Sequence, residues 1–91
     1  MKIAVDVQVG RRGVAQLRAA GHDVLKADHG EPDREWFARA QAWGAELVVS
    51  PDGDLEILCY DNRVAFFKVR VAKKHGGRDI ADAVLAHIAR G

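Results

Sequence analysis

The chain has few of the residues that hold small secreted or fibrous proteins together. Its 91 residues include one cysteine, Cys59, and two prolines, and aromatic residues make up 7% of the total. A single cysteine allows no internal disulfide and fits a reducing compartment, so we predict that Cys59 fills the core. Stability must then come from an ordinary hydrophobic core, for which 48% hydrophobic residues are sufficient.

Long apolar runs are also missing from the sequence. No stretch approaches the roughly 20 apolar residues of a membrane-spanning helix. The first apolar segment, Ile3–Val5, is too short for the apolar region of a signal peptide. We therefore expect a cytoplasmic protein with no membrane partner.

Neither sign of charge dominates, because 14 Lys and Arg residues stand against 13 Asp and Glu residues. The distribution is uneven: residues 1–62 carry seven basic and eleven acidic side chains, whereas residues 63–91 carry seven and two. An acidic half that holds a cation beside a basic half that holds a phosphate backbone suits a nucleic-acid enzyme. A solvated basic edge, or a docking surface for an acidic partner, is the alternative.

Hydrophobic periodicity predicts strands that alternate with helices. We expect strands at 3–5, 22–26, 46–49 and 64–69, helices at 10–20, 33–44 and 78–89, and loops at 27–32 and 73–77. The segment 55–60 is ambiguous, and a helical turn is favoured over a strand. This order predicts one α/β domain over residues 1–91, with parallel strands joined by right-handed crossovers.

Acidic side chains follow two of the predicted strands: Asp6 follows the first, and Asp52 and Asp54 follow the third. Because the carboxyl ends of parallel strands meet at one edge of a sheet, these aspartates should converge there. The start of the second long helix lies at the same edge and adds Asp33 or Glu35. Like charges within about 6 Å of one another repel unless a cation lies among them.

This convergence predicts a divalent-metal site. Carboxylate oxygens suit Mg²⁺ or Mn²⁺, and a metal-bound water can attack phosphorus. The Ser50 hydroxyl could add a ligand or hold a bound water. Each acid also has a structural alternative, as a helix cap, a first-turn residue or a turn residue.

Basic side chains are the candidates for phosphate contacts. Arg11 and Arg12 lie close to Asp6 along the chain, and the stretch from Arg63 to Arg78 contains no acid. Contacts to RNA phosphates are therefore expected from six residues: Arg11, Arg12, Lys68, Arg70, Lys73 and Lys74.

Several segments resemble those of the small PIN-like nucleases. Residues 1–6 read Met-Lys-Ile-Ala-Val-Asp, and residues 17–24 read Leu-Arg-Ala-Ala-Gly-His-Asp-Val, similar to the first strand and the first helix–strand junction of that group. Residues 33–37, Asp-Arg-Glu-Trp-Phe, and 47–55, Leu-Val-Val-Ser-Pro-Asp-Gly-Asp-Leu, are similar to its next two motifs. The resemblance covers residues 1–55 and extends over the remainder only by element order.

The resemblance implies a three-layer α/β/α sandwich with a mostly parallel four-stranded sheet. It also implies a divalent-metal-dependent endoribonuclease, which in many single-domain members is the toxin of a toxin–antitoxin pair. Carried over by position, Asp6, Asp52 and Asp54 would be metal-site acids, and either Asp33 or Glu35 would be the second acid. The implied partners are an RNA substrate, an antitoxin protein and, because the domain is small, a second copy of the chain.

Two departures from the family pattern bear on catalytic activity rather than on the fold. Val7 and Gln8 follow Asp6 where these nucleases often have Glu-Asn, and Leu55 replaces the more usual aromatic residue. The alternative is a catalytically degenerate PIN-like domain that binds a protein partner. A phosphoacceptor domain of receiver type is a weaker alternative, because it normally needs two adjacent acids after the first strand.

Overall fold

The computed structural model describes residues 1–69 and 77–90. Within them, strands alternate with helices in the expected order, and a 3₁₀ turn, Val7–Val9, joins the first strand to the first helix. The boundaries differ from the predicted ones by one or two residues at most ends. The strands are β1 Lys2–Val5, β2 Asp23–Lys26, β3 Leu47–Ser50 and β4 Ala65–Lys68, and the helices are α1 Gly10–Ala19, α2 Asp33–Trp43, α3 Gly53–Asp61 and α4 Gly77–Ala89.

The helix α3 is longer than the helical turn predicted at 55–60. It begins earlier because Asp52 caps it: the Asp52 side chain accepts a hydrogen bond from the Asp54 backbone N–H at 2.9 Å, which satisfies a donor that the first turn leaves unpaired. The predicted loop at 73–77 falls mostly outside the described residues, and Gly77 already belongs to α4.

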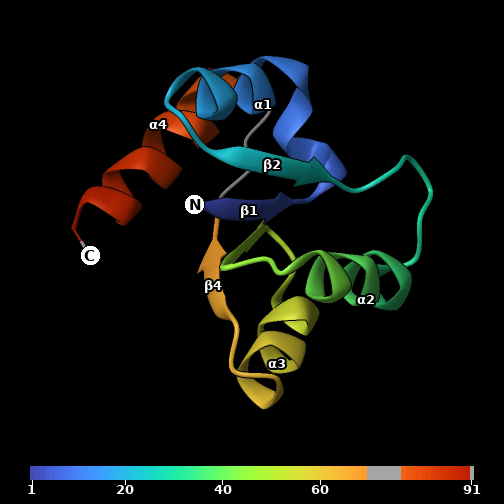
Figure 1. Cartoon of the computed structure of the whole chain (residues 1–91). Coiled ribbons are helices and arrows are strands. Elements are labelled where there is room, and N and C mark those ends of the chain that lie inside the picture. The colour runs from blue at the N-terminus through green and yellow to red at the C-terminus, as the bar shows by residue number, and fades with distance from the viewer. Residues whose placement is uncertain (70–76, 91) are drawn as a thin grey trace.

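The four strands form a single sheet in the order β2-β1-β3-β4. Every pairing among the described strands is parallel, so the sheet is wholly rather than mostly parallel. The chain moves from β1 outward to β2, returns across β1 to β3, and continues to β4 (Figure 1). The direction of winding therefore reverses between β1 and β3, and ligands bind at such a reversal, beyond the carboxyl ends of the strands.

Alternating residues of the strands build two separate hydrophobic cores, because successive side chains of a strand point to opposite faces. Ile3 and Val5 pack with α1 and α4 on one face, whereas Ala4 packs with α2 and α3 on the other, around the buried Trp36. Figure 1 shows the resulting three layers, with the sheet between two pairs of helices. None of the helices in the described ranges is long and apolar enough to span a bilayer.

Candidate functional site

The site is built where β1 and β3, the two central strands, end side by side. Asp6 directly follows β1, and its backbone N–H donates to the Val49 carbonyl at 2.9 Å, which continues the pairing of the two strands. Ser50 is the last residue of β3. Asp6 and Ser50 are the buried polar residues among those described, at 8% and 0% exposure. Both lie where the winding of the sheet reverses, between β1 and β3. Because both are buried, their polar atoms need hydrogen-bond partners.

A chain of hydrogen bonds connects Asp6 to Asp52 through Ser50. The Ser50 hydroxyl donates to Asp6 Oδ2 at 3.1 Å and accepts from the Asp52 backbone N–H at 3.0 Å. The other oxygen of Asp6, Oδ1, accepts from the Gln8 backbone N–H at 3.2 Å. Each Asp6 oxygen has a second lone-pair direction that these bonds leave open. The predicted capping role of Asp6 is thus observed, and it is compatible with binding a ligand.

Asp33 is the first residue of α2, and its carboxyl group lies near that of Asp52. The two carboxyl groups lie close enough together that each perturbs the pKa of the other. Burial raises the pKa of Asp33, and the hydrogen bond to Asp52 and the negative charges of Asp52 and Asp6 raise it further. The Asp54 backbone N–H, the Asp33 carboxyl group and the charge of Lys68 lower the pKa of Asp52. The negative charges of Asp6 and Asp52 therefore both act on Asp33.

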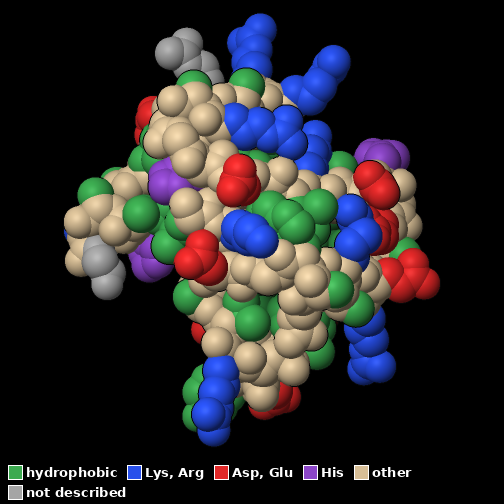
Figure 2. All heavy atoms as spheres, in the orientation of Figure 1, with side chains coloured by type: hydrophobic (Ala, Val, Ile, Leu, Met, Phe, Trp, Pro, Cys, Tyr) green, Lys and Arg blue, Asp and Glu red, His purple; other side chains and the backbone are tan. Residues whose placement is uncertain are grey.

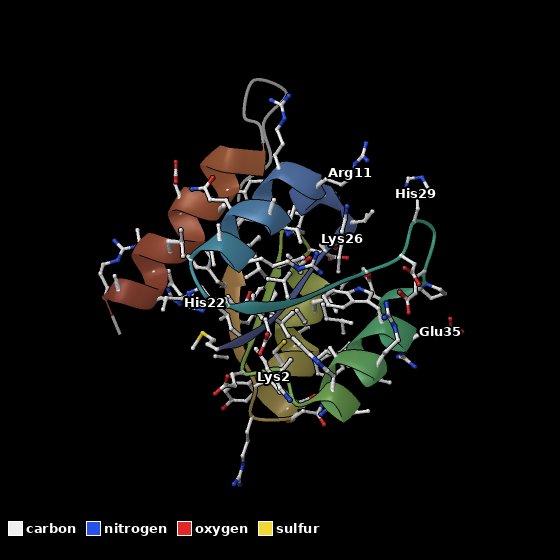
Figure 3. All side chains as sticks on the ribbon, turned by 45° about the horizontal axis from the view of Figure 1, so that its top comes forward. Lys2, Arg11, His22, Lys26, His29 and Glu35 are labelled. Atoms are coloured by element: carbon white, nitrogen blue, oxygen red, sulfur yellow. The ribbon has the colours of Figure 1, made fainter. Side chains whose placement is uncertain are left out.

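The other two predicted acids do not join this group. Glu35 projects from α2 into solvent (Figure 3), so of the two alternatives for the second acid the structure brings Asp33, not Glu35, to Asp52. Asp54 is exposed on the first turn of α3, where it lines a shallow groove with Asp33 and three residues of α2 and α3. Its backbone N–H donates to the Asp52 side chain, while its own side chain faces solvent.

The positive charge of Lys68, at the end of β4, acts on Asp52. Its Nζ atom lies 3.7 Å from the position that a Cβ atom would take on Gly53, directly over the turn that carries Asp52. Arg11 and Arg12 are exposed on the first turn of α1; Figure 3 shows Arg11 projecting into solvent, and Figure 2 shows basic side chains gathered over α1. The remaining predicted phosphate-binding residues, Arg70, Lys73 and Lys74, lie outside the described residues.

The acids suit a hard cation held by few protein ligands. In the described part of the chain, no group of three or more His, Cys, Asp or Glu side chains is arranged to enclose a metal ion. Mg²⁺ does not require such a cage, because it usually keeps several waters and binds through one or two carboxylates together with substrate phosphates. The Asp33–Asp52 pair, whose members cannot both ionise without repulsion, supplies two such carboxylates.

Ser50 is the site residue whose structural role was least evident from the sequence. Its hydroxyl was expected to hold a ligand or a water, whereas in the structure it bonds Asp6 and Asp52. A serine that ends a fully buried strand is the signal for such a role, because a buried hydroxyl needs partners.

Comparison of the chain with protein-family models, with curated proteins and with solved structures found no match. What the structure itself establishes is the α/β class and the four-stranded parallel sheet. Function is therefore inferred from the geometry of the acids and from the resemblance of the sequence motifs.

Proposed function

We propose that the chain is a divalent-metal-dependent endoribonuclease of PIN-like type. The observation that carries the proposal is that Ser50 joins Asp6 to Asp52 at the reversal point of the sheet, where the charges of both aspartates also act on Asp33. Keeping three carboxyl groups together costs stability, which a bound cation would recover. Such a cost is typical of functional sites.

Each residue of the proposed site has a distinct task. Asp52 and Asp33 would hold the cation, and Asp6, oriented by Ser50, would bind it as well or accept a hydrogen bond from a water bound to it. When bound, Mg²⁺ or Mn²⁺ would supply an ionised water at neutral pH and would stabilise charge on the phosphate. Lys68, next to Asp52, holds a phosphate oxygen of the substrate.

RNA is the proposed substrate because exposed arginines lie on the element that follows Asp6. Arg11 and Arg12 begin α1 and carry no acidic neighbour in the first turn of that helix. Free guanidinium groups of this kind hold phosphates in a salt-dependent manner.

The test is cleavage of a fluorescent single-stranded RNA with and without Mn²⁺. We expect Asp52→Asn and Asp33→Asn to reduce the cleavage rate about 100-fold or more, as loss of a group that acts in the chemical step does. Glu35→Gln is the matched control, because it removes an acid two residues away that points into solvent. Equal rates for Asp33→Asn and wild type, or cleavage that persists in EDTA, would refute the proposal.

A second candidate is the degenerate PIN-like module that binds a protein. It is favoured because Asp6 and Asp52 both serve as caps, and because no three-ligand metal group occurs in the described ranges. The resemblance further extends the nuclease proposal to a toxin with an antitoxin partner. Expression of the chain should then arrest bacterial growth and Asp52→Asn should not, whereas a binding module should behave alike with and without this substitution.

A further inference from the structure

The two edge strands of the sheet, β2 and β4, differ in how their outward backbone groups are covered. Strand β2 uses Asp23 and Ala27 to pair with β1, so the backbone groups of Val24 and Lys26, which alternate with these, point outward. Their carbonyls are covered: Arg18 donates to Val24 O at 3.1 Å, and Arg39 donates to Lys26 O at 3.4 Å. Two arginine side chains therefore block this edge against another strand, in the way that natural sheets protect their edges.

In the described part of the chain, no arginine covers the opposite edge, β4, in this way. Val69 N–H donates to Ser50 O at 3.1 Å, so Val69, Phe67 and Ala65 direct their backbone groups toward β3, and Phe66 and Lys68 direct theirs outward. Within residues 1–69 and 77–90, no side chain or backbone group bonds the outward groups of Phe66 or Lys68. Figure 1 shows β4 as the outer strand of the sheet, between the helix layers.

This edge is also unusually apolar for an exposed strand. Ala65 is exposed and both phenylalanines are half-buried, whereas all four residues of the neighbouring β3 are buried. An edge strand with two aromatic residues and open hydrogen-bonding groups is a template for another strand. Lys68 is its single charge.

We infer that β4 pairs with β4 of a second copy of this chain, antiparallel and centred on Phe67. In that register, Phe66 of each copy exchanges its two outward hydrogen bonds with Lys68 of the other, which gives four backbone bonds across the two-fold axis. The two four-stranded sheets become one continuous sheet. Both helix layers continue as well, because an axis perpendicular to the sheet keeps each face on its own side.

The edge is self-complementary, which points to a second copy rather than to an unrelated strand. Phe67 of one copy lies opposite Phe67 of the other in the non-hydrogen-bonded position, where side chains come closest and aromatic pairs are favourable. Phe66 lies beside Lys68 of the other copy, where the apolar stem of the lysine can cover the ring while its ammonium group stays near Asp52. An unrelated strand with charged residues at these positions would lose the Phe67–Phe67 contact, the Phe66–Lys68 contact or both.

A dimer built on β4 needs more buried area than the strand alone supplies. The accessible surface of the described chain is 5835 Å². A stable interface takes about 800 Å² from each partner, which four residues of strand cannot supply alone. Further apolar surface lies next to the strand, where Met1, 46% exposed, lines a hollow with Ala65 and Ile88.

Directed cross-linking tests both the pairing and its register. In the inferred dimer, Phe67→Cys places two thiols at a non-hydrogen-bonded pair with Cα atoms about 4.5 Å apart, which a disulfide can span. Ala65→Cys is the matched control on the same strand and face, because its two copies would lie about 14 Å apart, four residues out of register. The native Cys59 is fully buried and stays reduced, as the wild type will show.

We expect wild type to sediment as a dimer at micromolar concentration, and mild oxidation to cross-link Phe67→Cys at least tenfold faster than Ala65→Cys. Circular dichroism of the reduced Phe67→Cys variant checks that it folds. If that variant is unfolded, Ala65→Glu, at an exposed position of the same edge, should convert the dimer to a monomer, while Ala42→Glu on α2 should not. A wild type that is monomeric at 100 μM, roughly the concentration at which a weak complex would still form, or equal cross-linking of both cysteine variants, would overturn the inference.

Discussion

Replacing Ser50 with alanine removes the hydroxyl that joins β1 to the turn before α3. The side chain is fully buried, and its loss costs two hydrogen bonds, one to the Asp6 carboxylate and one from the Asp52 backbone N–H. A bond to a charged group contributes about 1.5–3 kcal/mol and a neutral one about 0.5–1.5 kcal/mol, so Ser50→Ala should lower the free energy of unfolding by about 2–4 kcal/mol. For a domain of this size the melting temperature should fall on the order of 10–25 °C.

Urea unfolding monitored by tryptophan fluorescence measures this effect, because Trp36 is buried against the same sheet. Cys59→Ala is the matched control: Cys59 is also fully buried, and its truncation removes one heavy atom and no hydrogen bond, at a cost of about 1 kcal/mol. We expect a clearly larger loss of unfolding free energy for Ser50→Ala than for Cys59→Ala. If the two variants are equally stable, the hydroxyl does not hold the acids as described.

Three further predictions concern the acids, the thiol and the arginines. Because the pKa of Asp33 is raised above 3.8 in the folded chain, the native state binds this proton more tightly than the unfolded state does, and the free energy of unfolding falls as pH rises from 3.8 through the raised pKa. Asp33→Asn should therefore be more stable than wild type at pH 7, and urea titrations should show that this difference disappears below pH 3.8. Burial raises the pKa of Cys59 to about 11, so Ellman's reagent should label it at pH 8 only after unfolding, and rapid labelling of the native chain would contradict its burial. Replacing both Arg11 and Arg12 with alanine should flatten the dependence of log K for RNA on log salt by about 1.4, two single-strand phosphate contacts, and an unchanged slope would remove them from the RNA path.

The order of strands and helices was predictable from the sequence because hydrophobic residues recur with different periods in the two kinds of element. The alternation of Ile3, Ala4 and Val5 between two cores needs a strand with a helix layer on each face. The reversal of winding between β1 and β3 was not predictable in detail, but the parallel pairing that brings Asp6 and Asp52 together was. Helix α3 was underestimated because its start depends on a cap, a local hydrogen bond that periodicity does not record.

The composition of the site was only partly predictable, for geometric reasons. Residues two apart on a helix point in nearly opposite directions, so only the placement of α2 against the sheet decides between Asp33 and Glu35. The bridge through Ser50 depends on the register of β3 against β1, and the approach of Lys68 to Asp52 depends on β4 lying beside β3. None of these relations is visible along the chain.

Calorimetric titration of Mn²⁺ into the wild type and into the Asp6→Asn/Asp52→Asn double variant tests the proposed metal site most directly. We expect saturable binding by the wild type and none by the double variant, with circular dichroism showing that both are folded. Glu35→Gln should bind as wild type does. A folded wild type that binds no Mn²⁺, with or without a short RNA present, would contradict the metal site and leave the protein-binding module as the function to pursue.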